Sequence, residues 1–350
     1  MSTAEYKSPG GKLVRVELDT DGGVISRASV SGDFFLEPDE ALECINRALV
    51  GAPAQADTPT LAARIEAALP PDAKLIGFDA NAVATAANRA LGLGSAWDQL
   101  QFDVIPPVVM HPELHVALDE VIAAEVAAGR RRPTLRFWDW DQPVVVIGSF
   151  QSVRSEVDLT AARQYGIRVV RRITGGGAMF MEPGNCVTYS LVVPGWLVAG
   201  MSYQASYAFL DQWIIGALAG VGVVARYVPL NDIASQAGKI GGAAQRRFAT
   251  GVVLHHVTMS YDIDADKMQE VLRIGREKLS DKGIRSANKR VDPMRSQTGL
   301  PREAIMASFI EYFMGCYSAR LSSYTEAELA AAQQLAHDKF TNPDWTYRVE

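Results

Sequence analysis

The sequence predicts an α+β protein of two domains, and three observations lead to this. The chain has 350 residues, more than a single domain ordinarily contains. Segments with the two-residue period of strands mix with segments of helical period, without strict alternation. Glycines and a pair of prolines interrupt both periods between residues 92 and 107. We therefore predict a small α+β domain over 1–95, a linker over 96–105 and a larger domain over 106–350.

The small domain begins with a predicted hairpin. Residues 12–31 alternate apolar and polar side chains on both sides of the turn signal "TDGG". A helix is expected from about Pro38, because proline suits the first helical position. Thr58 precedes a proline and an apolar stripe, which predicts a second helix with Thr58 as its cap. A third helix is expected over 79–91.

The larger domain contains both periods throughout. We expect helices over 113–128, 201–220, 266–280, 301–316 and 325–338. We expect strands over 134–138, 143–150, 166–173, 186–193 and 251–263.

Composition excludes several classes of function. The chain is 48% hydrophobic and 21% charged, as soluble globular proteins are, and its net charge of -6 gives no basis for bulk binding of nucleic acid. Its three cysteines form neither a disulfide framework nor a metal-ligand spacing. No apolar run is long enough for a signal peptide or a membrane span. We expect a cytoplasmic protein without nucleic-acid or membrane partners.

Three consecutive glycines stand out in "RRITGGGAMF", residues 171–180. Each glycine weakens regular structure by roughly 0.5–1 kcal/mol relative to alanine. Exposed backbone N–H groups and nearby guanidinium groups bind phosphate well. The dinucleotide and P-loop glycine patterns do not fit. Taken alone, the segment is as typical of a turn as of a phosphate site.

A second unusual segment is "NDIASQAGKIGGAAQRRF", residues 231–248. Lys239 is surrounded by glycines and alanines, which leave room for a ligand. A lone lysine is ordinarily solvated surface, but an ammonium group here would be a compact charge for a phosphate or carboxylate. Asp232 could pair with Lys239 or hold a metal ion.

Two histidines and a cysteine lie in predicted strands. His255 and His256 point to opposite faces and so are not ligands of one zinc ion. We interpret them as one core and one surface histidine. Cys186 is interpreted as a buried structural cysteine. The alternative, a nucleophile, would require a low thiol pKa beside a cation.

Together these segments resemble one family. "RRITGGGAMFMEPGNCVTYS", "GKIGGAAQRR" and "LHHVT", in this order, are similar to the motifs of lipoate–protein ligases. "LHVALDEVI" and "LRFWDWDQPVVVIGSFQ" resemble the family's opening helix and first sheet segment. The resemblance covers 106–350 and implies a mixed-sheet catalytic domain of the biotin/lipoyl protein ligase type. Residues 7–51 resemble the family's accessory domain, here placed before the catalytic domain.

The resemblance implies a two-step reaction. Lipoate and ATP, with Mg²⁺, give lipoyl-AMP and pyrophosphate, and the lipoyl group then passes to a lysine of an acceptor protein. The implied acceptors are the lipoyl domain of a dehydrogenase E2 subunit, the glycine cleavage H protein or a dedicated lipoate-binding protein.

The resemblance also implies roles for individual residues. Lys239 would be catalytic, touching the lipoyl carbonyl and the phosphate. Arg172 would hold the carboxylate or phosphate, and Asp232 would bind Mg²⁺ or orient Lys239. The remaining substrate and nucleotide residues implied are Thr174, Gly175, Gly176, Gly177, Ala178, Met179, Phe180, Asn185, Gly242, Ala243 and His256.

Four positions depart from the family pattern. Met181 stands where a histidine is usual, and Ile173 where a serine precedes the glycines, although Thr174 is retained. Val257 stands where the family's histidine pair is followed by glycine, and Ser149 where many members have arginine.

Two alternatives remain open. One is an ATP-independent octanoyl or lipoyl transferase using Cys186, and the other is a non-catalytic acceptor-binding protein, against which the presence of Lys239 argues.

Overall fold

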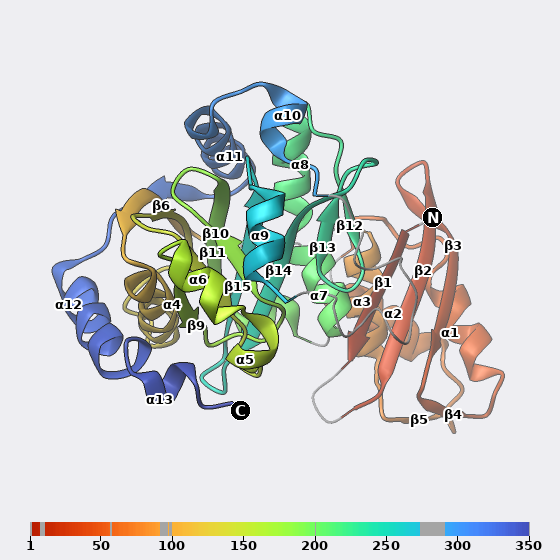
Figure 1. Cartoon of the computed structure of the whole chain (residues 1–350). Helices are drawn as coiled ribbons and strands as arrows, with labels where there is room; N and C mark the ends of the chain where they lie inside the picture. Colours follow the sequence, from red (N-terminus) through yellow and green to blue (C-terminus); the bar gives the residue numbers. More distant parts are fainter. Residues whose placement is uncertain are drawn as a thin grey trace. The chain divides into compact units, whose positions relative to one another are not determined.

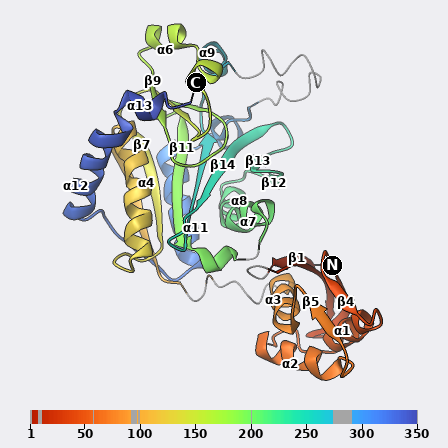
Figure 2. The same ribbon diagram turned by 90° about the horizontal axis from the view of Figure 1, so that it is seen from below.

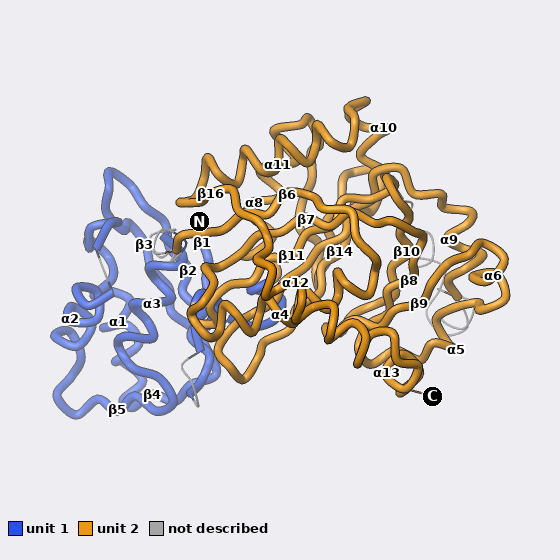
Figure 3. Tube along the Cα trace, turned by 90° about the vertical axis from the view of Figure 1, so that its left-hand side faces the viewer, with its two compact units in different colours: residues 1–99, 197–206 blue, residues 100–196, 207–350 orange. Residues whose placement is uncertain are grey.

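The structure is a computed structural model, which describes residues 2–7, 11–56, 58–91, 97, 100–199, 201–273 and 291–349. The chain divides into two compact units, coloured separately in Figure 3. Unit 1 comprises Met1–Gln99 and Leu197–Ser206, and unit 2 comprises Leu100–Trp196 and Tyr207–Glu350.

Unit 1 is a small α+β unit with its own core. Its antiparallel sheet has the order β1-β2-β3, and β4 pairs with β5. The strands are β1 Ser2–Lys7, β2 Leu13–Asp21, β3 Val24–Gly32, β4 Phe35–Glu37 and β5 Lys74–Ile76. The helices are α1 Ala41–Leu49, α2 Thr58–Ala68 and α3 Ala80–Ala90. The predicted hairpin and three helices are confirmed, with one difference. Helix α1 begins at Ala41 and not at Pro38, because Pro38 starts a turn in which its carbonyl accepts from the Ala41 N–H.

Unit 2 is built on an eight-stranded mixed sheet of the order β12-β13-β14-β15-β11-β7-β6-β16 (Figure 1). The pairs β16–β6 and β6–β7 are parallel, and the others are antiparallel. Its strands are β6 Phe102–Met110, β7 Thr134–Trp140, β11 Cys186–Pro194, β12 Arg226–Val228, β13 Asp232–Ala234, β14 Lys239–Arg247, β15 Val252–Ser260 and β16 Ala319–Leu321. The α+β class with a mixed sheet is therefore confirmed.

A second, three-stranded sheet of the order β10-β8-β9 completes the strands of unit 2. It contains β8 Val144–Ile147, β9 Arg168–Arg171 and β10 Met179–Met181. The glycine segment connects β9 to β10, so both of its ends are held by one small sheet. Valines and isoleucines of β8 are buried, as the continuous apolar run "VVVI" predicts.

Helices surround these sheets. Figure 2 shows α4 alongside β7 and β11, which it contacts together with β15. The helices are α4 Pro112–Ala127, α5 Val153–Glu156, α6 Leu159–Gln164, α7 Tyr203–Leu210, α8 Gln212–Gly220, α9 Ala265–Val271, α10 Met294–Thr298, α11 Arg302–Cys316, α12 Glu326–Leu335 and α13 Pro343–Thr346, with a 3-10 turn at Gly195–Val198 and a π-helical turn at Ala336–Phe340.

Some expectations were wrong in detail. Strand β6 starts at Phe102, inside the predicted linker, because the proline pair lies at a register shift between Ile105 and Val108 and does not end the strand. The helix expected over 201–220 is divided at Asp211 into α7 and α8. Helix α9 ends at Val271, and residues 274–280 of the helix predicted there lie outside the described residues.

Among the residues that the structure describes, no helix is long and apolar enough to cross a membrane.

Candidate functional site

A cavity of about 270 Å³ lies in unit 2, between the large sheet, the small sheet and the glycine segment. Strands β7, β8, β10, β11, β14 and β15 all contribute to its wall. It is lined by Trp138, Trp140, Val146, Gln151, Glu156, Arg172, Gly177, Ala178, Met179, Met181, Thr188, Asn231, Lys239, Gly242, Ala243, Ala244, His256 and Thr258.

The three glycines occupy three different environments. Gly176 has φ +90, which side chains rarely adopt, and a Cβ there would lie 2.9 Å from Arg172 Nη2. A Cβ on Gly175 would make only ordinary contact with Phe150, whereas one on Gly177 would meet nothing within 4 Å. Gly177 lines the cavity, so its missing side chain leaves space for a ligand. The segment is therefore partly a turn and partly a ligand-facing surface.

Arg172 holds the glycine segment through hydrogen bonds to Thr174 and to two glycine carbonyls. Its Nε donates to Thr174 Oγ1 at 2.8 Å, and its Nη2 donates to the carbonyls of Gly175 at 2.6 Å and Gly177 at 2.9 Å. Its Nη1 donates to the Val146 carbonyl at 3.2 Å. Burial lowers the pKa of the guanidinium to about 10, so it stays charged at neutral pH. Most of its donors shape the backbone, which leaves little of the guanidinium fork for a ligand.

Lys239 is ion-paired inside the cavity region. Its Nζ lies 2.8 Å from Asp232 Oδ1, and the lysine side chain is 34% exposed. Gly242 is opposite Asp232 in the ladder, and a Cβ there would lie 3.2 Å from Lys239 Nζ. The glycine thus makes room for the pair, as the small residues around Lys239 indicate. An ammonium group held this way remains accessible from the cavity.

Both histidines of β15 are buried, so the interpretation of one as a surface residue was wrong. His255 pairs with Asp211, with Nε2 2.6 Å from Oδ1, on the face opposite the cavity. His256 lines the cavity, where its Nδ1 lies 2.9 Å from Asp119 Oδ2. Helix α4 packs on β15, and Tyr207 of α7 and Asp211 lie against His255, so the alternation of a half-exposed strand does not apply. Burial lowers the pKa of His256 below its ordinary value.

The far wall of the cavity is aromatic and weakly polar. Trp138 and Trp140 point to the same side of β7, with ring centroids 5.3 Å apart. Met181, in the family's histidine position, lies 3.8 Å through its sulfur from the hydroxyls of Thr188 and Thr258. These two hydroxyls are 3.2 Å apart. Hydroxyls and a thioether therefore provide the polar atoms here.

Cys186 is a core residue, as its default interpretation predicts. Its side chain packs with the apolar residues below the large sheet and is 1% exposed. Burial raises the pKa of its thiol to about 11, and it is not part of the cavity wall. The thiolate that a nucleophile requires is therefore disfavoured at neutral pH.

The structure divides the fourteen predicted site residues into three groups. Those that line the cavity are Arg172, Gly177, Ala178, Met179, Lys239, Gly242, Ala243 and His256. Thr174, Gly175, Gly176 and Asp232 lie directly behind this wall, hydrogen-bonded to its members or adjacent in the glycine segment. Phe180 packs into a separate core cluster, and Asn185 closes the turn between β10 and β11 by accepting from the Glu182 N–H.

Several residues of the cavity wall were not predicted from the sequence. Trp138 and Trp140 alternate in "FWDW", a two-residue period that places both on one face. Gln151 lies in the loop after β8 and accepts from the Gly148 N–H at 2.8 Å. Thr188 and Thr258 come from strands whose pairing brings them opposite one another. Only the tryptophans carry a signal that the sequence alone could have provided.

The potential metal ligands around the cavity include the carboxylate of Asp232. Within the described ranges, which omit 274–290 among others, no group of three or more His, Cys, Asp or Glu side chains could hold a metal ion. Asp232 supplies one carboxylate beside the cavity, already paired with Lys239. Mg²⁺ is commonly bound by one or two carboxylates together with substrate phosphates. Side chains at the cavity would therefore supply at most part of the ligands of a bound Mg²⁺.

Residues 111–315 match the family model of the lipoyl protein ligase A/B catalytic domain. The chain belongs to this family. It is therefore an enzyme of the lipoate ligase and octanoyltransferase group. The matched region begins beyond residue 99, so it does not include the first part of unit 1.

Individual relatives agree with this assignment. A Mycoplasma pneumoniae protein named "Probable lipoate-protein ligase A" is 26% identical over 67% of this chain and 68% of its own length. The octanoyltransferase LipM of Symbiobacterium thermophilum is 30% identical over 67% of this chain and 93% of its own. A bi-partite lipoate protein ligase of Thermoplasma acidophilum, solved in a study that includes its E2 lipoyl domain, is 26% identical, with a TM-score of 0.62 over 71% of this chain and 98% of its own.

Proposed function

We propose that this family member is an ATP-dependent lipoate–protein ligase. The observation that carries the proposal is the chemistry of the cavity wall, which contains the Lys239 ammonium and none of the chain's three cysteines. Cys44 belongs to unit 1, Cys316 ends α11, and Cys186 is buried with a raised pKa. An acyl group activated as an adenylate needs cations and N–H donors, but no thiol.

In the proposed first step, a carboxylate oxygen of lipoate attacks the α-phosphorus of ATP. The P–O bond to the β-phosphate breaks, and pyrophosphate leaves with the electron pair. Negative charge grows on the α-phosphate oxygens, and Lys239 is placed to stabilise it from the cavity wall. The N–H groups around Gly177, where no side chain intervenes, are candidates for the same role. Arg172 contributes by holding the carbonyls of this segment turned away from the phosphates.

In the proposed second step, the amine nitrogen of an acceptor lysine attacks the lipoyl carbonyl. The bond to the phosphate oxygen breaks, AMP leaves, and the amine proton passes to solvent. Lys239 would stabilise the developing oxyanion, so one side chain serves both steps. Asp232 would keep the ammonium group directed into the cavity, because it holds Nζ by an ion pair. The tryptophan-lined wall is suited to the apolar lipoyl chain.

Magnesium enters the proposal as a companion of the nucleotide. Mg²⁺ would neutralise phosphate charge, and Asp232 is the carboxylate nearest to Lys239 that could contact it. No role as a metal ligand is proposed for His255 or His256, because each is already hydrogen-bonded to a buried aspartate.

The proposed partner is a lipoyl-acceptor domain. The Thermoplasma acidophilum relative was studied together with an E2 lipoyl domain, which supports this class. The H protein of glycine cleavage and a dedicated lipoate-binding protein remain alternatives of the same class. We further propose that unit 1 is the accessory domain, placed before the catalytic domain. The relative with the bi-partite arrangement shows that a ligase of this family can be divided between two parts.

The proposal is tested by weighing an apo lipoyl domain after incubation with the protein. With lipoate, ATP and Mg²⁺, we expect the acceptor to gain one lipoyl group and pyrophosphate to be released. Omitting ATP should abolish the gain.

A second candidate is the octanoyltransferase, favoured by the 30% identity to LipM. Its test uses the same acceptor with an octanoyl acyl-carrier protein and no ATP. Mass gain under these conditions, together with no gain from lipoate and ATP, would replace the ligase proposal.

A further inference from the structure

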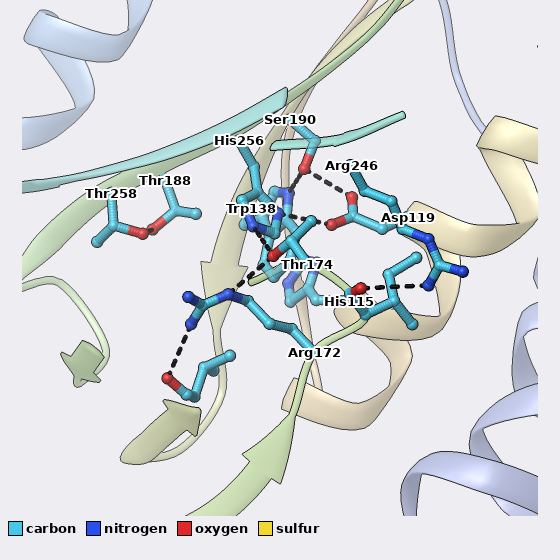
Figure 4. A network of polar contacts seen from close by, with 12 residues as sticks. His115, Asp119, Trp138, Arg172, Thr174, Thr188, Ser190, Arg246, His256 and Thr258 are labelled. Carbon is cyan, nitrogen blue, oxygen red and sulfur yellow. Dashed lines mark hydrogen bonds and ion pairs between the residues drawn. The ribbon is translucent and has the colours of Figure 1, made fainter. Parts of the chain in front are cut away.

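A chain of hydrogen bonds runs from the glycine segment into the core (Figure 4). Arg172 Nε donates to Thr174 Oγ1 at 2.8 Å, and Thr174 Oγ1 lies 2.8 Å from His256 Nε2. On the other side of the ring, His256 Nδ1 lies 2.9 Å from Asp119 Oδ2. Asp119, in α4, does not line the cavity and is 1% exposed. The residue at the end of this chain therefore reaches the cavity only through others.

Asp119 determines the direction of the hydrogen bonds on both sides of the His256 ring. Its other oxygen, Oδ1, accepts from Arg136 Nη2 at 2.7 Å and from Ser190 Oγ at 2.6 Å. The ionised carboxylate of Asp119 can only accept hydrogen bonds. His256 must therefore carry its proton on Nδ1, from which it donates to Asp119. Nε2 then accepts from the Thr174 hydroxyl, whose oxygen is left to accept from Arg172. Each donor thus meets an acceptor, from the guanidinium to the carboxylate.

We propose that Asp119 is a positioning residue for the reaction in the cavity. It fixes the tautomer of His256 and, through Thr174, the guanidinium that holds the carbonyls of Gly175 and Gly177. The inference rests on the proposed adenylate-forming function for its catalytic consequence, but the tautomer itself can be measured independently of activity.

The substitution Asp119→Asn reverses this chain rather than removing it. Arg136 has no acceptor to offer, so the amide oxygen must stay on its side and the amide nitrogen must face His256. The ring then accepts at Nδ1 and carries its proton on Nε2. This N–H points at Thr174 Oγ1, which already accepts from Arg172. Thr174 Oγ1 can accept from both donors, but the Thr174 hydroxyl has then lost the acceptor for its own proton, and the hold on the glycine segment weakens.

The first measurement is the ¹⁵N spectrum of the imidazoles at neutral pH. The chain has five histidines, and His256→Asn identifies the signal of interest. We expect His256 to be protonated at Nδ1 in the wild-type protein and at Nε2 in Asp119→Asn. An Nε2–H tautomer in the wild type would overturn the proposal whatever the enzyme catalyses.

The second measurement is the rate of pyrophosphate release with lipoate and ATP. We expect Asp119→Asn and Thr174→Val each to lower kcat by about 10–100-fold, as loss of a positioning partner commonly does. KM for lipoate should change far less, because the glycine segment acts on charge that develops in the transition state. Thr174→Ser, which keeps the hydroxyl, should restore the rate. The double variant should be no slower than the slower single variant, because both act through one chain.

The matched control is Asp211→Asn. Asp211 is as buried as Asp119 and pairs with the neighbouring His255, but on the face away from the cavity. Its substitution should lower the unfolding midpoint and leave kcat unchanged.

Equal losses of kcat in Asp119→Asn and Asp211→Asn, or additive losses in the double variant, would show a general structural effect and overturn the proposal. If the Asp119 variant does not fold, Thr174→Val and Thr174→Ser still decide, because neither alters a buried charge. A wild-type protein with the Nδ1–H tautomer but no ATP-dependent activity would instead contradict the proposed function.

Discussion

Lys239 and Cys186 offer opposite chemistry to an acyl group, although strand pairing places both in the large sheet. The lysine is ion-paired and reaches the cavity, whereas the thiol is sealed in the core. The sequence already indicated this difference through the glycines and alanines around the lysine. It could not show that Gly242 is opposite Asp232, which is what leaves the space for the pair.

We expect Lys239→Ala to lower the rate of acceptor lipoylation at least about 100-fold, because one stabiliser of developing charge is lost. Cys186→Ala should keep the wild-type rate. Mass spectrometry of the acceptor over time measures both. Lys267→Ala is the control, since that lysine pairs with Glu182 outside the cavity. A folded but inactive Cys186→Ala protein would favour the transferase instead.

His256 illustrates the limit of residue-level prediction. Its alternation with His255 correctly indicated opposite faces, but the exposure of one face was wrong. A strand shows alternating exposure only when one face meets water, and α4 covers the face that carries His256. Asp119 was missed for the same reason, because an acidic residue in a helix gives no sign that the helix is buried there.

At the level of elements, the glycine segment is held by the loop after β8. A Cβ on Gly148 would lie 2.1 Å from the Gly176 carbonyl oxygen, and the Ser149 N–H donates to the Thr174 carbonyl at 2.7 Å. Arg171 and Arg348 bind carbonyls of the same loop. The C-terminal residues thus support a loop that is distant in sequence, and no local pattern predicts this.

Gly148, which makes this contact, and Gly177, which does not, should respond differently to substitution by alanine. Gly148→Ala should lower the free energy of unfolding by about 1–3 kcal/mol or more, because its Cβ overlaps backbone. Gly177→Ala should change it by less than about 0.5 kcal/mol, because its Cβ meets open space. Gly177→Ala should instead raise KM for ATP, since the methyl group enters the cavity.

Urea unfolding and steady-state kinetics on both variants test this pair. A stable Gly148→Ala protein, or a Gly177→Ala protein with unchanged KM, would show that the close approach or the open face has been misassigned.

Strand β14 shows how a pattern can conceal an element. Its sequence, "KIGGAAQRR", has few β-formers and reads as a loop. Pairing with β15 over seven positions makes it a strand nevertheless. Gly242, Ala243 and Ala244, which weaken its local propensity, line the cavity, so function and propensity conflict here.

At the level of the whole molecule, unit 2 contains a buried histidine that couples its stability to pH. His115 Nε2 lies 2.6 Å from the Asp139 carbonyl, where its N–H donates. Burial, and then the charge of Arg136, lower the pKa of His115 to about 3, whereas an unfolded histidine titrates near 6.5. Between these values the unfolded chain binds more protons than the folded one. The stability that His115 contributes is therefore constant well above pH 6.5 and is lost as the pH drops from 6.5 toward 3.

We expect the free energy of unfolding of unit 2 to be lower at pH 5 than at pH 7. The contribution of His115 is about 2 kcal/mol over this range, from about 1.4 kcal/mol per pH unit below 6.5. His115→Gln keeps a donor near the Asp139 carbonyl and should reduce the loss by that amount. Urea unfolding followed by tryptophan fluorescence at both pH values measures it. An equal loss in the wild type and the variant would assign the effect to other groups, of which His256 is the first candidate.

The order of the longer helices and of strands β2, β3, β7, β8, β9, β11 and β15 was predictable from the sequence, because apolar period and turn residues act over short distances. The glycine segment, Lys239 and Asp232 were recognisable for the same reason, since their residue types alone indicate an anion site. The sharing of one cavity by Trp138, Thr188 and Thr258, and the burial of Asp119 beneath it, followed only from the pairing of strands that are far apart in the chain. Hydrogen bonding between distant strands and burial of a face are collective properties, which no single segment encodes.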